Sequence, residues 1–120
     1  MKKNFSVLLL AMAIIFVGGQ EKVSAEEEYY VGTFKDGHAA YMVLRTWELA
    51  NPKTLNFKGA VRAVKGNNSF LIWYEFWFDG QNTYYKNSQG FSGIIDQYQT
   101  PIAYEIYRVN LIILAHAMGK

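Results

Sequence analysis

Residues 56–78, NFKGAVRAVKGNNSFLIWYEFWF, decide the predicted fold of this chain. They form two β-prone arms around residues 65–68, a turn-forming Lys-Gly-Asn-Asn stretch. With those four residues as the loop, apolar side chains oppose apolar ones and a lysine opposes a glutamate, and a slip of one residue loses both matches. The segment therefore predicts an antiparallel hairpin in a single register. The implied pairs are Val64 with Ser69, Val61 with Ile72, Phe57 with Phe76, and Lys58 with Glu75.

The second arm, residues 69–78, is apolar on both faces, which is typical of a central strand covered on both sides. The acidic Glu75 is the exception in this arm. We expect Lys58 on the opposite strand to neutralise it. One face carries Phe70, Ile72, Tyr74, Phe76 and Phe78, and the other carries Leu71, Trp73, Glu75 and Trp77.

Further hairpin signals flank this segment. Residues 29–46 predict a hairpin around Asp36-Gly37, because a type I′ turn needs positive φ at both central positions. Residues 47–54 read as a connection that contains Trp47 and is closed by Asn-Pro. In the first hairpin we expect Phe34 opposite Ala39 and Gly32 opposite Tyr41, with the missing glycine side chain leaving room for the ring.

Two short segments follow the second arm. Asp79-Gly80 predicts another hairpin turn into a strand over residues 81–86. Residues 91–97 fit either a last short strand or an irregular loop.

The C-terminal segment predicts a helix. Thr100 suits the N-cap, Pro101 suits the first helical position, and Gly119 suits the C-cap. A strand through residues 112–114 is the competing interpretation, but the start, period and stop signals agree on a helix. The predicted class is α+β, an antiparallel β-meander of about five strands with one C-terminal α-helix packed on the sheet. Apolar residues at helical spacing are Ile102, Ile106, Val109, Ile113 and Ala117.

Residues 1–25 have the three parts of a cleavable signal peptide. Lys2 and Lys3 precede an apolar run over residues 5–17, and a small-residue cleavage site ends at Ala25. A permanent anchor is the rival interpretation, but a spanning helix needs about 20 apolar residues, and this run has 13. We therefore expect cleavage after Ala25 and a single exported domain over residues 26–120, secreted or periplasmic, with no membrane span after processing.

The charge balance of the predicted mature chain is neutral. The full chain has 12 basic and 10 acidic residues, and loss of Lys2, Lys3, Lys22 and Glu21 leaves nine of each. No basic excess remains to bind nucleic acid. The chain has no cysteine and 20 aromatic residues, so aromatic packing or association must supply the stability that disulfides give many small exported domains.

No residue pattern in the chain predicts catalysis, a metal site or a cofactor. His38 and His116 lack zinc-site spacing, and the serines lack the G-x-S-x-G pattern of a nucleophile. Glu75 is the one candidate acid, since burial within an apolar strand would raise the pKa of a carboxyl group that had no partner. The sequence therefore favours a non-enzymatic function over an enzymatic one.

The aromatic side chains carry the one functional hint. Trp73 and Trp77 share one face of the second arm. If the helix covers the other face, these rings form an exposed strip of the kind that contacts proteins, peptides or sugars. If the helix covers the Trp73 face, they belong to the core. The favoured function is a non-catalytic binding or interaction module outside the cytoplasm, whose partner is another protein, a peptide or a glycan. The alternatives are a structural subunit of a cell-envelope assembly and a small hydrolase using Glu75 or a histidine. The candidate ligand-binding residues are Trp47, Trp73, Trp77, Tyr84 and Tyr85.

Overall fold

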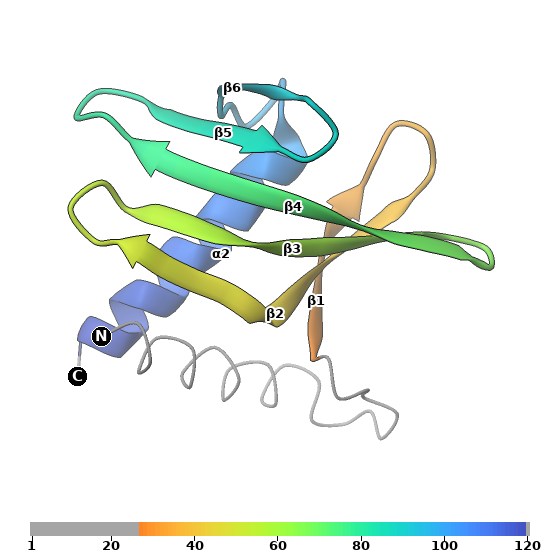
Figure 1. The fold of residues 1–120 in the computed structure, drawn as a ribbon, viewed down its shortest axis with the longest axis horizontal. Coiled ribbons are helices and arrows are strands. Elements are labelled where there is room, and N and C mark those ends of the chain that lie inside the picture. The colour runs from red at the N-terminus through yellow and green to blue at the C-terminus, as the bar shows by residue number, and fades with distance from the viewer. Residues whose placement is uncertain (1–26, 120) are drawn as a thin grey trace.

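Six antiparallel strands lie side by side in sequence order, and one helix crosses behind them (Figure 1). The computed structural model describes residues 27–119, so the predicted signal peptide over residues 1–25 lies outside the described residues. The predicted α+β class and the single C-terminal helix are confirmed. The sixth strand is in the segment whose sequence left strand and loop open. The elements are β1 Glu28–Thr33, β2 Ala39–Asn51, β3 Asn56–Lys65, β4 Asn68–Phe78, β5 Thr83–Asn87, β6 Ser92–Ile94 and α2 Pro101–Met118.

The β3–β4 hairpin has the register that the sequence predicts. All four predicted pairs are observed. The loop is shorter than expected, because Lys65 also pairs with Asn68 and only two residues remain in the turn. Gly66, with φ of 62°, adopts the left-handed conformation that such a turn needs.

The β1–β2 hairpin forms, but its predicted register is wrong. Tyr30 pairs with Tyr41, and a bulge then places Gly32 opposite Ala40 and Thr33 opposite Ala39. Phe34 therefore belongs to the turn rather than to the ladder. The space at Gly32 serves the helix instead of the Tyr41 ring, since a Cβ there would lie 3.1 Å from Cγ1 of Ile102 in α2.

The predicted connection over residues 47–54 is wrong in its first half. Strand β2 continues to Asn51, immediately before Pro52. Its ladder with β3 is interrupted between Val43 and Glu48. There the Thr46 hydroxyl replaces a backbone partner: Thr46 Oγ1 accepts from Ala60 N at 2.8 Å and donates to Val43 O at 2.7 Å.

The extension of β2 turns Trp47 into the core. Its side chain is fully buried, and its Nε1 donates to the carbonyl oxygen of Ala60 at 3.0 Å. The indole occupies the space above Gly59, where an added Cβ would lie 2.1 Å from Cδ2 of Trp47. Because Gly59 has no side chain, β3 leaves room for Trp47, the largest side chain of the core.

Helix α2 covers one face of the sheet. Tyr107 contacts the rings of Phe57 and Phe76, with centroid distances of 5.8 and 5.6 Å. The core of the domain lies between this face and the helix. Among the described residues, no helix is long and apolar enough to cross a membrane. The helical residues predicted to face inward are buried, apart from the half-buried Ala117; the buried ones are Ile102, Ile106, Val109 and Ile113.

The ends of α2 lie where the sequence predicts them, but the caps differ. Thr100 makes no side-chain cap bond, and its hydroxyl instead accepts from Asp96 N at 2.7 Å. Gly119 has φ of −79°, a right-handed conformation open to other residues. Pro101 therefore remains the clearest local start signal.

Candidate functional site: the open face of the sheet

Figure 1 shows α2 on one side of the sheet, and we call the opposite side the open face. Exposed apolar side chains lie on this face. Leu71 and Trp73 in β4 lie on it and are 48% and 51% exposed. They alternate along β4 with Ile72 and Tyr74, which are buried under the helix. The alternation of side chains along β4 therefore determines which of its aromatic residues are exposed to solvent.

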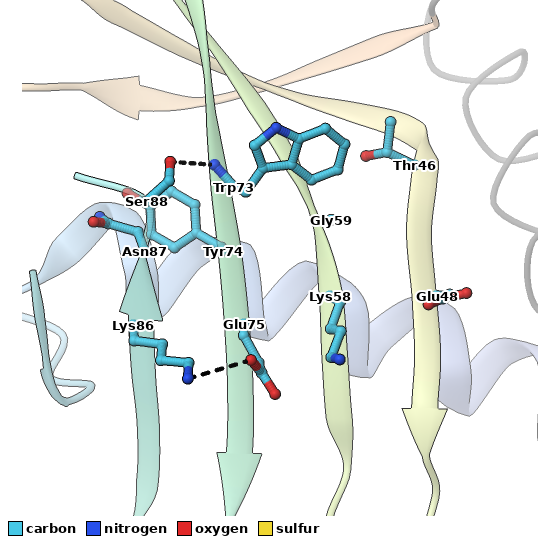
Figure 2. A pocket seen from close by; sticks show the side chains of 10 residues that line it. All are labelled: Thr46, Glu48, Lys58, Gly59, Trp73, Tyr74, Glu75, Lys86, Asn87 and Ser88. Atoms are coloured by element: carbon cyan, nitrogen blue, oxygen red, sulfur yellow. Dashed lines mark hydrogen bonds and ion pairs between the residues drawn. The ribbon is translucent and has the colours of Figure 1, made fainter. Parts of the chain in front are cut away.

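Four charged residues form a row across the open face, one from each of four neighbouring strands. Glu48 in β2 pairs with Lys58 in β3, Lys58 with Glu75 in β4, and Glu75 with Lys86 in β5. Figure 2 shows the four side chains side by side. The signs alternate along this charge row, so each side chain has opposite charges as neighbours.

Two neighbours in the described structure hold Glu75. Lys86 Nζ lies 3.8 Å from Glu75 Oε1, and Asn56 Nδ2 donates to Glu75 Oε2 at 3.1 Å. Lys58 lies directly opposite Glu75, as expected, and the ion pair of Glu75 is with Lys86 on the other neighbouring strand. The carboxylate is thus engaged on both oxygens.

A hollow of about 440 Å³ lies between the charge row and Trp73 (Figure 2). Its volume is within the range of small-ligand sites. Asn87 and Ser88 line one end, and Thr46 the other. Ser88 fixes the backbone of Trp73, since Trp73 N donates to Ser88 Oγ at 2.9 Å and Ser88 N donates to Trp73 O at 2.9 Å.

A pair of stacked rings lies on the other side of the charge row from Trp73. Trp77 and Tyr84 pair across β4 and β5 and stack with centroids 5.8 Å apart and planes 14° apart. Lys86 Nζ lies 6.0 Å from the Trp77 ring centroid. Aromatic side chains therefore flank the charges on both sides along β4.

The structure brings together three of the five predicted aromatic site residues. Trp73, Trp77 and Tyr84 share the open face. Trp47 is buried in the core, and Tyr85 lies on the helix side with its ring 6.2 Å from that of Tyr74.

Sequence reasoning missed the cationic half of the site. Lys86 was not singled out, and Lys58 was considered only as a partner of Glu75. The Asp79-Gly80 turn is the signal that could have found Lys86. A loop over residues 79–82 pairs Phe78 with Thr83 and so fixes Lys86 opposite Glu75.

A second hollow, of about 410 Å³, lies on the helix side of the sheet at the start of α2. Phe34, Phe70 and Phe91 are among its walls, and Tyr74 is buried at its base. Burial disfavours the phenolate and raises the pKa of Tyr74 to about 12, against the effect of a hydrogen bond with Asn87. Tyr74 therefore stays protonated at physiological pH.

The raised pKa of Tyr74 predicts a loss of stability in alkali. An unfolded tyrosine ionises near pH 10. The contribution of the buried phenol is therefore complete below about pH 10 and is lost as the pH rises to about 12. Urea titrations measure the free energy of unfolding at each pH. Between about pH 10 and pH 12, this free energy should fall in the wild type relative to Tyr74→Phe by up to about 1.4 kcal/mol per pH unit. Parallel pH profiles for the two proteins would contradict the burial of this hydroxyl.

The histidines lie at separate places in the fold. His38 follows the first turn, with Nδ1 3.0 Å from Asp36 Oδ1, and His116 is in the last turn of α2. Within residues 27–119, no three His, Cys, Asp or Glu side chains are grouped so that they could hold a metal ion.

Comparison with known proteins gives no relative for this chain. A scan against protein-family models, a search of curated proteins and a search of solved structures each found no match.

Proposed function

We propose that this protein is an exported, non-catalytic interaction module whose open face binds a partner outside the cytoplasm. The observation that carries the proposal is the half-exposed Trp73 beside Leu71, on a face where an alternating charge row supplies polar contacts. Large rigid aromatic side chains contribute contact area at a low entropic cost, and they are enriched at binding surfaces. A protein, a peptide or a glycan could use such a surface.

The chemistry of Glu75 supports binding over hydrolysis. A hydrolytic site needs two groups that converge on one reacting atom. Glu75 is instead held by Lys86 and Asn56, and its cross-strand neighbours are two lysines. Neither His38 nor His116 lines the open-face hollow; His38 lines the second hollow, on the helix side of the sheet and away from Glu75. A small hydrolase is therefore the weaker alternative.

Site-specific photocrosslinking tests the open face. A photoreactive benzoylphenylalanine at Leu71 is expected to give adducts in an export-competent bacterial host. The same group at Ile112, an equally exposed position on α2 (47%), is the matched control. Adducts at Leu71 that are missing at Ile112 would support the proposal, and their mass would report the partner. Equal adducts at both positions, or none at Leu71 when glycan adducts are also sought, would refute it.

Export predicts a defined amino terminus. Mass spectrometry of the protein recovered from the periplasm or medium is expected to find Glu26 as its first residue, because small side chains at Val23 and Ala25 fit signal peptidase. A chain that retains residues 1–25 would instead favour a membrane-tethered protein.

A further inference from the structure

We propose that the partner of the open face is a second copy of this chain, docked face to face about a two-fold axis parallel to the strands and passing between β3 and β4. This inference rests on the proposed function, since it assigns a partner to the same surface. It also agrees with the alternative function, a structural subunit of a cell-envelope assembly, because such a subunit would associate with itself.

The charge row is complementary to itself under this rotation. From β2 to β5 its signs run minus, plus, minus, plus, through Glu48, Lys58, Glu75 and Lys86. The axis lies at the middle of the row, so rotation by 180° reverses the order of the partner's charges. Glu75 then faces Lys58 of the second copy, and Glu48 faces Lys86. Each contact occurs twice, as a two-fold interface requires.

Other arrangements of two open faces lack this match. An axis along the row, perpendicular to the strands, would place each charge against its own counterpart, so that all four contacts would be repulsive. A shift of the partner by one strand would bring like charges into contact, and a shift by two strands would leave two charges of each copy without a counterpart. Complementary charges set register and orientation more than raw affinity, so the row selects one geometry.

Trp73 supplies the apolar centre of the proposed interface. Its side chain extends from β4 toward Gly59 in β3 and so lies beside the proposed axis (Figure 2). Rotation brings the two Trp73 rings together, with the charge contacts to one side of them. Two sheets pack about 10 Å apart with strands nearly aligned, and an axis close to the strand direction produces that arrangement.

The net charge of the predicted mature chain permits the contact. Nine basic and nine acidic residues remain in residues 26–120, so no long-range repulsion separates two copies. The four side chains of the row are at least partly exposed and keep water contact as monomers. Because salt screens exposed charges, we expect the dimer to weaken as ionic strength increases.

Two charge-reversal variants test the geometry. In Lys58→Glu the new carboxylate would face Glu75 of an identical partner, and in Glu75→Lys two lysines would face each other. Each variant alone should dimerise at least about ten-fold more weakly than the wild type, because both central contacts become repulsive. An equimolar mixture should form a heterodimer, since all four contacts are then between opposite charges.

Sedimentation velocity at low salt would measure association, and native mass spectrometry would identify the heterodimer. Lys53→Glu and Glu105→Lys make the same changes in net charge away from the row, at the β2–β3 connection and on α2, and should dimerise like the wild type. Circular dichroism and thermal unfolding check that each variant folds. If Lys58→Glu fails to fold, Lys58→Gln replaces it, and its mixture with Glu75→Lys should still associate more than either alone.

A wild-type protein that stays monomeric at high concentration and low salt, or a mixture that stays monomeric, would overturn the two-fold dimer. The photocrosslinking result separates this failure from that of the proposed function. A monomer that still gives adducts of another mass at Leu71 refutes only the self-association. A monomer without open-face adducts refutes both.

Discussion

Replacing Gly59 by alanine is expected to destabilise the domain by about 3 kcal/mol or more, one of the two largest effects predicted from this structure. The new Cβ would lie 2.1 Å from Cδ2 of Trp47. The indole cannot move aside easily, because it is fully buried and its Nε1 is bonded to Ala60 O at 3.0 Å. Urea unfolding monitored by circular dichroism would measure the loss.

A double variant tests the cause of this loss. Trp47→Leu removes the ring that the new methyl group would meet, so adding Gly59→Ala to it should cost at least 2 kcal/mol less than in the wild type, on the order expected for residues in direct contact. Additive effects would place the cost in the backbone of β3 instead. A cost below about 1 kcal/mol for Gly59→Ala alone would contradict the contact itself.

Truncating Trp47 to alanine is expected to cost about 4 kcal/mol or more, whereas Trp73→Ala should cost about 1 kcal/mol or less. The first change opens a cavity in the core and removes the donor to Ala60 O. The second affects a side chain that is already 51% exposed. Paired urea titrations of the two variants provide the measurement.

The same pair separates stability from function. Trp73→Ala should fold and lose open-face association, while Trp47→Ala should lose association only as far as it unfolds. The assignment of Trp47 to the core would be contradicted if both variants unfolded at the same urea concentration as the wild type.

The β3–β4 register could be predicted from sequence because its determinants are local. A short loop joins the two strands, and matches such as Phe57 with Phe76 and Lys58 with Glu75 fix the ladder within the 23 residues from 56 to 78. The β1–β2 register could not be predicted in the same way. It contains a bulge at Gly32, and the reason for that glycine is Ile102, 70 positions later in the chain.

The open face was half visible in the sequence. Alternation along β4 put Trp73 and Trp77 on one side, and the prediction of exposure depended on which side the helix would cover. Predicting the charge row would have required the correct registers of the β2–β3, β3–β4 and β4–β5 pairs together. The sequence analysis placed Glu48 in a connection, whereas the structure pairs it with Lys58 beyond a break in the β2–β3 ladder.

The sequence by itself determined the α+β class, the C-terminal helix and the central hairpin, because turn residues, periodicity and neighbouring-strand matches act over short distances. Only the tertiary structure decided that Trp47 fills the space above Gly59, that α2 covers the Phe57 face and that four charges align across the open face. These outcomes depend on packing between segments far apart in the chain, where the volume of one side chain is matched by the absence of another.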